Sequence, residues 1–248
     1  MLFRETNNRE LPTIILLHGG GLSCWSLSGV VELLKADYNV VTPIIDGHGE
    51  NGGETFISIE DSADKLLEYI KNKCGGKVFA LGGLSIGAQI ITEVLSKRSD
   101  ISQFAILEST LVLPLKGVTT LTVPTYKFFY GLIKMKWFSR MQAKTLFVPE
   151  DMFEAYYKDS LQMSKQSLIN ITLSNGNYKL KDNIEKTKTK VLIITGEKEL
   201  GIMKKSAQVL NTKIPDSTLY LSRQMGHGEL SLVHPKEYVK VIKEFFSK

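Results

Sequence analysis

Ser85 lies between two glycines in a G-x-S-x-G pattern that is completed by Gly83 and Gly87. An apolar run at residues 78–81 precedes the pattern, and residues 88–97 have the apolar spacing of a helix. Small flanking residues suit a tight strand-to-helix turn, because they remove the Cβ atoms that would collide around an exposed nucleophile. The same turn frees the first N–H groups of the helix to stabilise negative charge. The pattern predicts acyl transfer through Ser85; a glycine-rich turn of another parallel α/β protein is the alternative.

A serine hydroxyl needs a base to take its proton and an acid to orient that base. Among the four histidines, His227 follows the last expected strand in a glycine-flanked loop, and we predict that it is the base for Ser85. His18 and His48 lie in glycine-rich turns and are expected to be structural, with their side chains bonded to nearby backbone. His234 begins a helix and is expected to be exposed or to cap it.

Three glutamates are candidates for the acid. Glu197 and Glu199 follow the strand predicted at 191–195, and Glu108 follows the strand predicted at 103–107. Glu199, the third residue after Gly196, is our first choice; Glu197 is nearer the turn, and either it or Glu108 could serve. Each of the three could instead be a solvated loop carboxylate, which is the usual place of a glutamate.

Short apolar strands alternate with helical segments along most of the chain. The strands are predicted at 13–17, 38–43, 78–81, 103–107, 191–195 and 218–221, and the helices at 25–35, 59–73, 88–97, 203–210 and 234–246. This alternation predicts an α/β fold with a mostly parallel sheet, helices on both faces, and a site at the carboxyl ends of the strands.

The alternation stops between residues 110 and 185, where helical patterns rich in aromatic residues replace it. We predict a core formed by 1–109 and 186–248, with 110–185 inserted as a helical cap. Residues 110–149 carry six basic residues and no acidic one. We favour an interpretation in which the aromatic side chains line a dry pocket above the serine while the basic ones are solvated. The alternative is that this stretch rests on anionic lipid.

The overall composition is that of a soluble globular protein. The 248 residues are 43% hydrophobic and 23% charged, with a formal net charge of +5. The sequence has neither the long apolar stretch of a membrane span nor the apolar core of a secretory leader. Two widely separated cysteines, Cys24 and Cys74, suit reduced thiols, so we expect a cytoplasmic protein.

No cofactor or metal is expected, because the sequence shows no metal-ligand cluster, phosphate-binding loop or dinucleotide fingerprint. Nucleic acid is not a favoured partner either, since the basic residues are interleaved with large apolar ones. The expected partner is a small-molecule ester. The sequence does not predict an oligomeric state.

Five motifs occur in a fixed order along the chain. They are His18–Gly21, Asp46–Gly49, Gly83–Gly87, Gly196–Glu199 and Gly226–Gly228. In this order the chain resembles the α/β-hydrolase superfamily, and within it the small capped serine esterases and monoacylglycerol-lipase-like members. The resemblance covers about residues 11–109 and 186–248; the insertion matches in position only.

This resemblance implies roles for individual residues. Ser85 would be the nucleophile, His227 the base and Glu199 the acid. The backbone N–H groups of Gly20 and Ile86 would form an oxyanion hole, in which such donors each lower the barrier by roughly 3–4 kcal/mol. Two departures are visible: the family's acid is usually Asp, and the segment before the first long strand is too short for the family's opening hairpin, which trims an edge of the sheet.

The predicted function is hydrolysis of a small-to-medium carboxylic ester through an acyl-enzyme on Ser85. One alternative is a C–C bond hydrolase or an elimination-type lyase on the same fold, whose anionic substrate would explain the lysines of the insertion. A non-catalytic ligand sensor is the third interpretation, because a fold does not fix a function.

Overall fold

The computed structural model describes residues 1–6 and 8–247. Within them, seven strands form one sheet in the order β1-β3-β2-β4-β5-β6-β7. The strands are β1 (Leu2–Glu5), β2 (Thr13–Leu17), β3 (Asn39–Ile44), β4 (Val78–Leu84), β5 (Ser102–Glu108), β6 (Lys190–Gly196) and β7 (Ser217–Ser222). β1 pairs antiparallel with β3, and every other neighbouring pair is parallel.

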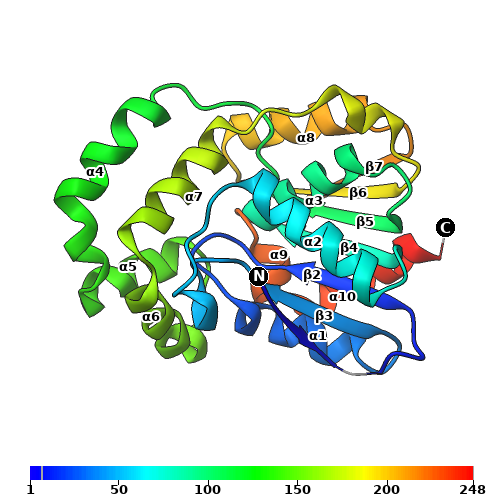
Figure 1. The fold of residues 1–248 in the computed structure, drawn as a ribbon, viewed down its shortest axis with the longest axis horizontal. Helices are drawn as coiled ribbons and strands as arrows, with labels where there is room; N and C mark the ends of the chain where they lie inside the picture. The colour runs from blue at the N-terminus through cyan, green and yellow to red at the C-terminus, as the bar shows by residue number, and fades with distance from the viewer. Residues whose placement is uncertain (7, 248) are drawn as a thin grey trace.

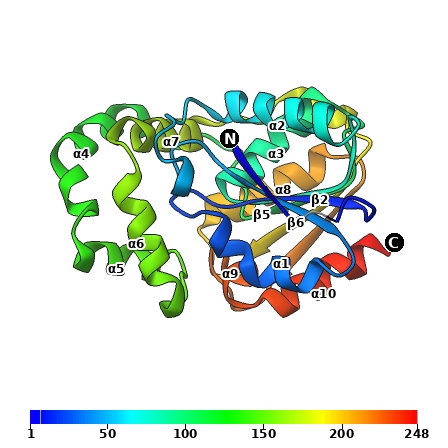
Figure 2. The same ribbon diagram turned by 60° about the horizontal axis from the view of Figure 1, so that its bottom comes forward.

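Helices cover both faces of this sheet (Figures 1 and 2). One face carries α2 (Ile59–Lys73), α3 (Ile86–Lys97) and α8 (Gly201–Lys213), and the other carries α1 (Ser28–Leu34), α9 (Glu229–Val233) and α10 (Pro235–Phe246). Successive side chains of a strand point to opposite faces, so each strand feeds both layers. In β2, Ile15 and Leu17 pack with α2 and α3, whereas Ile14 and Leu16 pack with α1 and α10.

The α2 helix shows how local sequence fixes these elements. The Ser58 hydroxyl accepts a hydrogen bond from the Asp61 N–H at 3.1 Å, which caps the first turn. Acidic residues occupy the first turn and lysines the last, as the helix dipole favours. The side chains of Leu66 and Ile70, four residues apart, are fully buried on the side that faces the sheet.

The predicted fold class is confirmed, and most predicted elements agree with the structure within a few residues. The helix predicted at 25–35 divides into a 3₁₀ turn, Cys24–Leu27, followed by α1. The N–H and the hydroxyl of Ser26 both donate to the Ser23 carbonyl, which closes the tighter turn. The short helix α9 was not predicted from the sequence. The N-terminal segment forms the single edge strand β1, in agreement with the expectation that it is too short for a hairpin.

Four helices lie between β5 and β6: α4 (Val118–Ile133), α5 (Lys136–Thr145), α6 (Phe153–Gln162) and α7 (Lys165–Asn177). Residues 109–189, all of which the structure describes, form helices and turns but no strand. The four helices gather at one end of the molecule, with α4 at its edge and α7 between α4 and the sheet (Figures 1 and 2). Across residues 1–6 and 8–247, no helix combines the length and apolar character needed to cross a bilayer.

Candidate active site

Ser85 occupies the turn between β4 and α3. Its backbone has φ 55° and ψ −116°, a strained conformation for a residue with a side chain. A Cβ atom on Gly83 would lie 2.5 Å from the carbonyl carbon of Gly87, and one on Gly87 would lie 2.6 Å from the carbonyl oxygen of His18. Both distances are too short for contacts between non-bonded atoms, so the turn can close this tightly only because both residues are glycine.

His227 lies in the loop between β7 and α9, and its side chain is 39% exposed. Its Nδ1 is 3.0 Å from Oε2 of Glu199, whose side chain is fully buried. Ser85, Glu199 and His227 all line one cavity of about 370 Å³. Among the contacts of the described residues, no hydrogen bond joins Ser85 to His227; such bonds are often long in unliganded enzymes and shorten when substrate binds.

The Glu199 carboxylate is held by several donors. Its Oε1 accepts hydrogen bonds at 2.8 Å from the Gly196 N–H and from the Ser109 hydroxyl. Burial raises the pKa of Glu199, but the hydrogen bond and charge of His227, together with these donors, outweigh burial and hold the pKa below its ordinary value. Glu199 is therefore an anion suited to orienting an imidazole.

The two other candidate acids have different partners. Glu197 is exposed, and its Oε2 accepts a hydrogen bond from the Gln224 N–H at 2.8 Å. Glu108 is buried, and its Oε1 accepts from the Ser231 N–H at 3.2 Å. Burial raises the pKa of Glu108 to about 7. Of the three glutamates left open by the sequence, Glu199 alone contacts His227.

Ser109 is a site residue that the sequence analysis missed. Its hydroxyl donates to Glu199 and accepts a hydrogen bond from the Gly228 N–H at 3.0 Å, next to His227. Its φ is 54°, so it shares with Ser85 a backbone conformation that side chains avoid. The available signal was a polar Glu-Ser-Thr run directly after an apolar strand, at the edge of the sheet where the other site residues lie.

Gly20 and Ile86 lie side by side near Ser85. A Cβ atom built on Gly20 would be 3.7 Å from Cγ2 of Ile86, and Gly20 lines two cavities together with Ser85. Within the described part of the chain, neither N–H is paired with a backbone or side-chain acceptor. Two free donors beside a serine can stabilise an oxyanion.

The remaining histidines lie where the sequence analysis expected them. Nδ1 of His18 donates to the Gly19 carbonyl at 2.8 Å, while its Nε2 accepts from the Ile45 N–H at 3.1 Å. Burial, helped by the neighbouring His48, lowers the pKa of His18 to about 3, and burial lowers that of His48 to about 4. Both rings are neutral structural groups. His234 is exposed at the start of α10.

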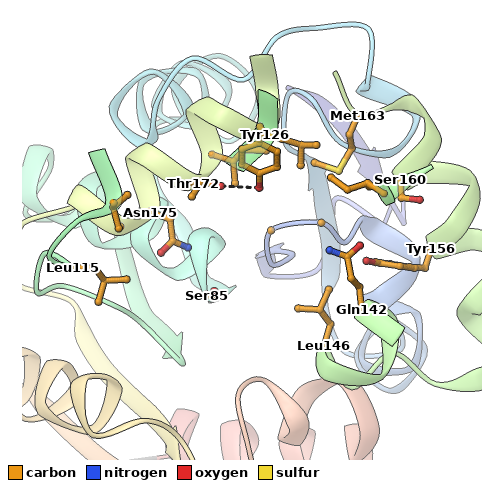
Figure 3. Close-up of a pocket in the computed structure, with 17 residues that line it drawn as sticks. Ser85, Leu115, Tyr126, Gln142, Leu146, Tyr156, Ser160, Met163, Thr172 and Asn175 are labelled. Carbon is orange, nitrogen blue, oxygen red and sulfur yellow. Dashed lines mark hydrogen bonds between the residues drawn. The ribbon is translucent and has the colours of Figure 1, made fainter. Parts of the chain in front are cut away.

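A second cavity, of about 360 Å³, also opens onto Ser85 (Figure 3). Tyr126 and Tyr156 line it, and the Tyr126 hydroxyl is 3.0 Å from Oγ1 of Thr172. Figure 3 shows the amides of Gln142 and Asn175 on opposite sides of the cavity, each pointing toward its centre. The expected aromatic pocket thus holds two tyrosines, whereas other aromatic residues of the insertion are exposed: Phe128, Phe129 and Trp137.

No lysine or arginine is among the described residues that line either cavity. The basic residues of the insertion therefore lie elsewhere. The described residues contain no group of three or more His, Cys, Asp or Glu side chains that could hold a metal ion.

The sequence of this chain matches the model of a known protein family. Residues 14–241 match the model of the "Alpha/beta hydrolase family". No curated protein sequence gives a significant match.

Several solved structures share this fold, which agrees with the family match. Their sequence identities are too low to assign a function to this chain. A thermophilic esterase from Thermogutta terrifontis is 18% identical, with a TM-score of 0.78 over 99% of this chain and 92% of that one. A bromoperoxidase from Bacillus anthracis is 17% identical, with a TM-score of 0.82 over 99% and 95%. An enol-lactonase from Burkholderia xenovorans is 14% identical, with a TM-score of 0.80 over 100% and 96%. The chain belongs to the alpha/beta hydrolase family.

Proposed function

We propose that the protein is a serine hydrolase that cleaves a small-to-medium carboxylic ester through an acyl-enzyme on Ser85. The observation that carries this proposal is the 3.0 Å contact between His227 and a buried Glu199, in a cavity that also contains a strained serine. A serine nucleophile needs an accessible hydroxyl, an imidazole that takes its proton, and a buried anion that orients the imidazole.

The proposed reaction has two halves. Oγ of Ser85 attacks the ester carbonyl as its proton passes to Nε2 of His227, whose Nδ1–H is held by Glu199. The tetrahedral oxyanion accepts hydrogen bonds from the N–H groups of Gly20 and Ile86. The intermediate collapses as His227 returns the proton to the leaving alcohol. Water then attacks the acyl-enzyme by the same route and releases the acid.

We also propose that residues 110–185 act as a cap on a core formed by 1–109 and 186–248. Support comes from the cavity of about 360 Å³, which is walled by residues of α4 to α7 on one side and by Gly20 and Ser85 on the other. A cap of this kind would select the substrate, while the core supplies the chemistry.

An ester fits the cavities better than an anionic substrate. The elimination-type lyase and the C–C bond hydrolase were considered because an anion would explain the lysines of the insertion. The described residues around Ser85 include neutral amides and apolar side chains but no cation, so the cavities offer no counter-charge.

A fluorophosphonate probe tests the proposal directly. We expect the wild-type protein to be labelled, and Ser85→Ala to lose all labelling. Ser96→Ala, at the far end of the same helix, is the matched control and should be labelled normally. A panel of p-nitrophenyl esters of increasing acyl length then measures the preferred substrate. Unchanged labelling of Ser85→Ala would refute the nucleophile, and a folded wild-type protein that neither reacts nor turns over would favour the non-catalytic sensor.

A further inference from the structure

The outward side of α4 and α5 exposes large apolar residues that no part of the described chain covers. Leu121 and Phe128, two helical turns apart on α4, are 66% and 74% exposed. On α5, Trp137 is 63% exposed, and Met141, four residues on, is also exposed. We call these four residues the α4–α5 face. Exposed apolar groups in such number mark a surface that meets a partner.

The charges around the α4–α5 face are mostly positive. Residues 110–149 contain no acid, and three of their six basic side chains, Lys116, Lys127 and Lys144, have no ion pair among the described residues. Two others are paired with acids from the following segment: Lys136 with Glu154 and Arg140 with Glu150. Lys134 donates to a backbone carbonyl. The surface therefore keeps a positive excess.

We propose that the α4–α5 face docks on an anionic lipid surface. Aromatic side chains such as Trp and Phe bind at the interface of a bilayer, and unpaired lysines are attracted to its anionic headgroups. A second copy of the chain is a poorer match, because a two-fold contact would place the same positive face against itself. Nucleic acid is a poorer match as well, since most of the exposed side chains of this face are apolar.

The position of α4 gives this docking a consequence for the cavity. Tyr126 and Ile133 on one side of α4 line the cavity beside Ser85, while Leu121 and Phe128 lie on other sides of the helix and are exposed. In both views α4 and α5 lie at the end of the molecule furthest from the C-terminal part of α10 (Figures 1 and 2). A single helix would thus separate the cavity from the lipid.

Co-sedimentation with vesicles tests the proposal without any measurement of catalysis, so its failure and a failure of the proposed hydrolase are distinguishable. We expect binding to vesicles that contain phosphatidylglycerol, weakening as salt rises, and little binding to pure phosphatidylcholine. Phe128→Ser combined with Trp137→Ser should lower binding at least tenfold. Lys127→Gln combined with Lys144→Gln should lower it roughly 30-fold, since each lysine near an anionic surface raises binding about fivefold. Leu33→Ser removes an exposed apolar side chain from α1, which packs beside α10 on the sheet, and is the control.

Tryptophan fluorescence locates the contact. The chain has two tryptophans, and Trp25 is anchored by a 2.7 Å hydrogen bond from its Nε1 to Asp159. Brominated lipid should quench the wild-type emission, and Trp137→Phe should remove that quenching while retaining binding. Equal binding to neutral vesicles, or no binding to anionic vesicles at low salt, would overturn the proposal. So would a concentration-dependent dimer that the Phe128→Ser, Trp137→Ser variant abolishes.

Discussion

Helices α2 and α4 use their apolar residues in opposite ways. α2 buries Leu66 completely against the sheet and exposes charged residues such as Asp64, which is paired with Lys97 at 2.6 Å. α4 has apolar residues on all sides, and Leu121 and Phe128 remain exposed. A helix that is apolar all round is normally buried. Burial thus fixes α2 on the sheet, whereas the outer side of α4 leaves apolar surface available to ligands or partners.

The largest loss of activity should come from substitutions in the core and not from substitutions in the insertion. Ser85→Ala and His227→Ala should each lower kcat by about 10⁴- to 10⁶-fold, and the double variant by little more, because nucleophile and base act as a unit. Trp137→Ser, in the insertion, should leave turnover of a short soluble ester unchanged. Steady-state kinetics on p-nitrophenyl acetate measures all four variants. Near-normal turnover in either single core variant would show that the triad is assigned wrongly.

The next effect separates two buried carboxylates of the core. Glu199→Gln should lower kcat by roughly 10²- to 10⁴-fold, because the imidazole loses the anion that orients it and stabilises its cation. Glu108→Gln should leave kcat close to that of the wild type, since Glu108 contacts the Ser231 N–H and not His227. The reverse ranking of the two variants would make Glu108 the acid.

A matched pair of leucines tests the comparison of the two helices itself. Leu66→Ala should lower the free energy of unfolding by about 2–5 kcal/mol, because it leaves a cavity in the packed core. Leu121→Ala should change it by no more than about 0.5 kcal/mol, as for other exposed positions. Urea denaturation followed by circular dichroism measures both. An equal loss for Leu121→Ala would mean that the outer side of α4 is packed in solution.

Glu108 should make the stability of the core depend on pH. Burial raises its pKa from 4.5 to about 7; the hydrogen bonds from Ser231 and the charge of His227 act against this rise, and the charge of Glu199 adds to it. Below pH 4.5 the carboxyl is protonated in both states and its contribution is fully present. Between pH 4.5 and about 7 the unfolded state ionises while the folded state keeps its proton, so stability falls with rising pH, by roughly 3 kcal/mol in all.

The measurement is the difference in unfolding free energy between the wild type and Glu108→Gln from pH 4 to pH 8. The wild type should lose stability relative to this variant as pH rises. Ser96→Ala, which removes no ionisable group, is the control and should show no such trend. A constant difference between wild type and Glu108→Gln would show that the pKa of Glu108 is not raised in the folded state.

Substitution of Ser109 should have the smallest effect on kcat, because Ser109 only positions Glu199 and the loop that carries His227. Ser109→Gly removes the hydroxyl and tolerates the positive φ, so we expect normal stability and a kcat about tenfold lower, with KM unchanged. Ser109→Ala should match it in kcat and be less stable, because alanine keeps the strained backbone. Full activity in Ser109→Gly would assign the residue a purely structural role.

Local sequence patterns were sufficient for the frame of the molecule. The bounds of α2 were predicted to the residue, because its cap, charges and apolar spacing all lie within that segment. The turn around Ser85 was also predictable, since Gly83 and Gly87 are adjacent to it in sequence. The α/β fold followed from the alternation of such segments, as the structure confirms.

Contacts between distant segments were not predictable in the same way. The choice among three glutamates depends on which one meets a loop 28 residues after Glu199. The role of Ser109 depends on partners 90 and 119 residues away. The split of the aromatic residues between cavity and surface depends on how α4 packs on its neighbours, because a helix that is apolar on all sides carries no periodic signal for its orientation.

The hydrogen bond between Ser109 and Glu199 joins two points of the core that flank the helical insertion, one before α4 and one after β6. It links the two ends of the long segment that forms helices α4 to α7. The free energy of closing a loop grows only slowly with its length, so the same hydrogen bond can close inserted segments of different lengths. If the proposed cap selects the substrate, another helical segment grafted between β5 and β6 should change substrate choice and leave Ser85, Glu199 and His227 in place.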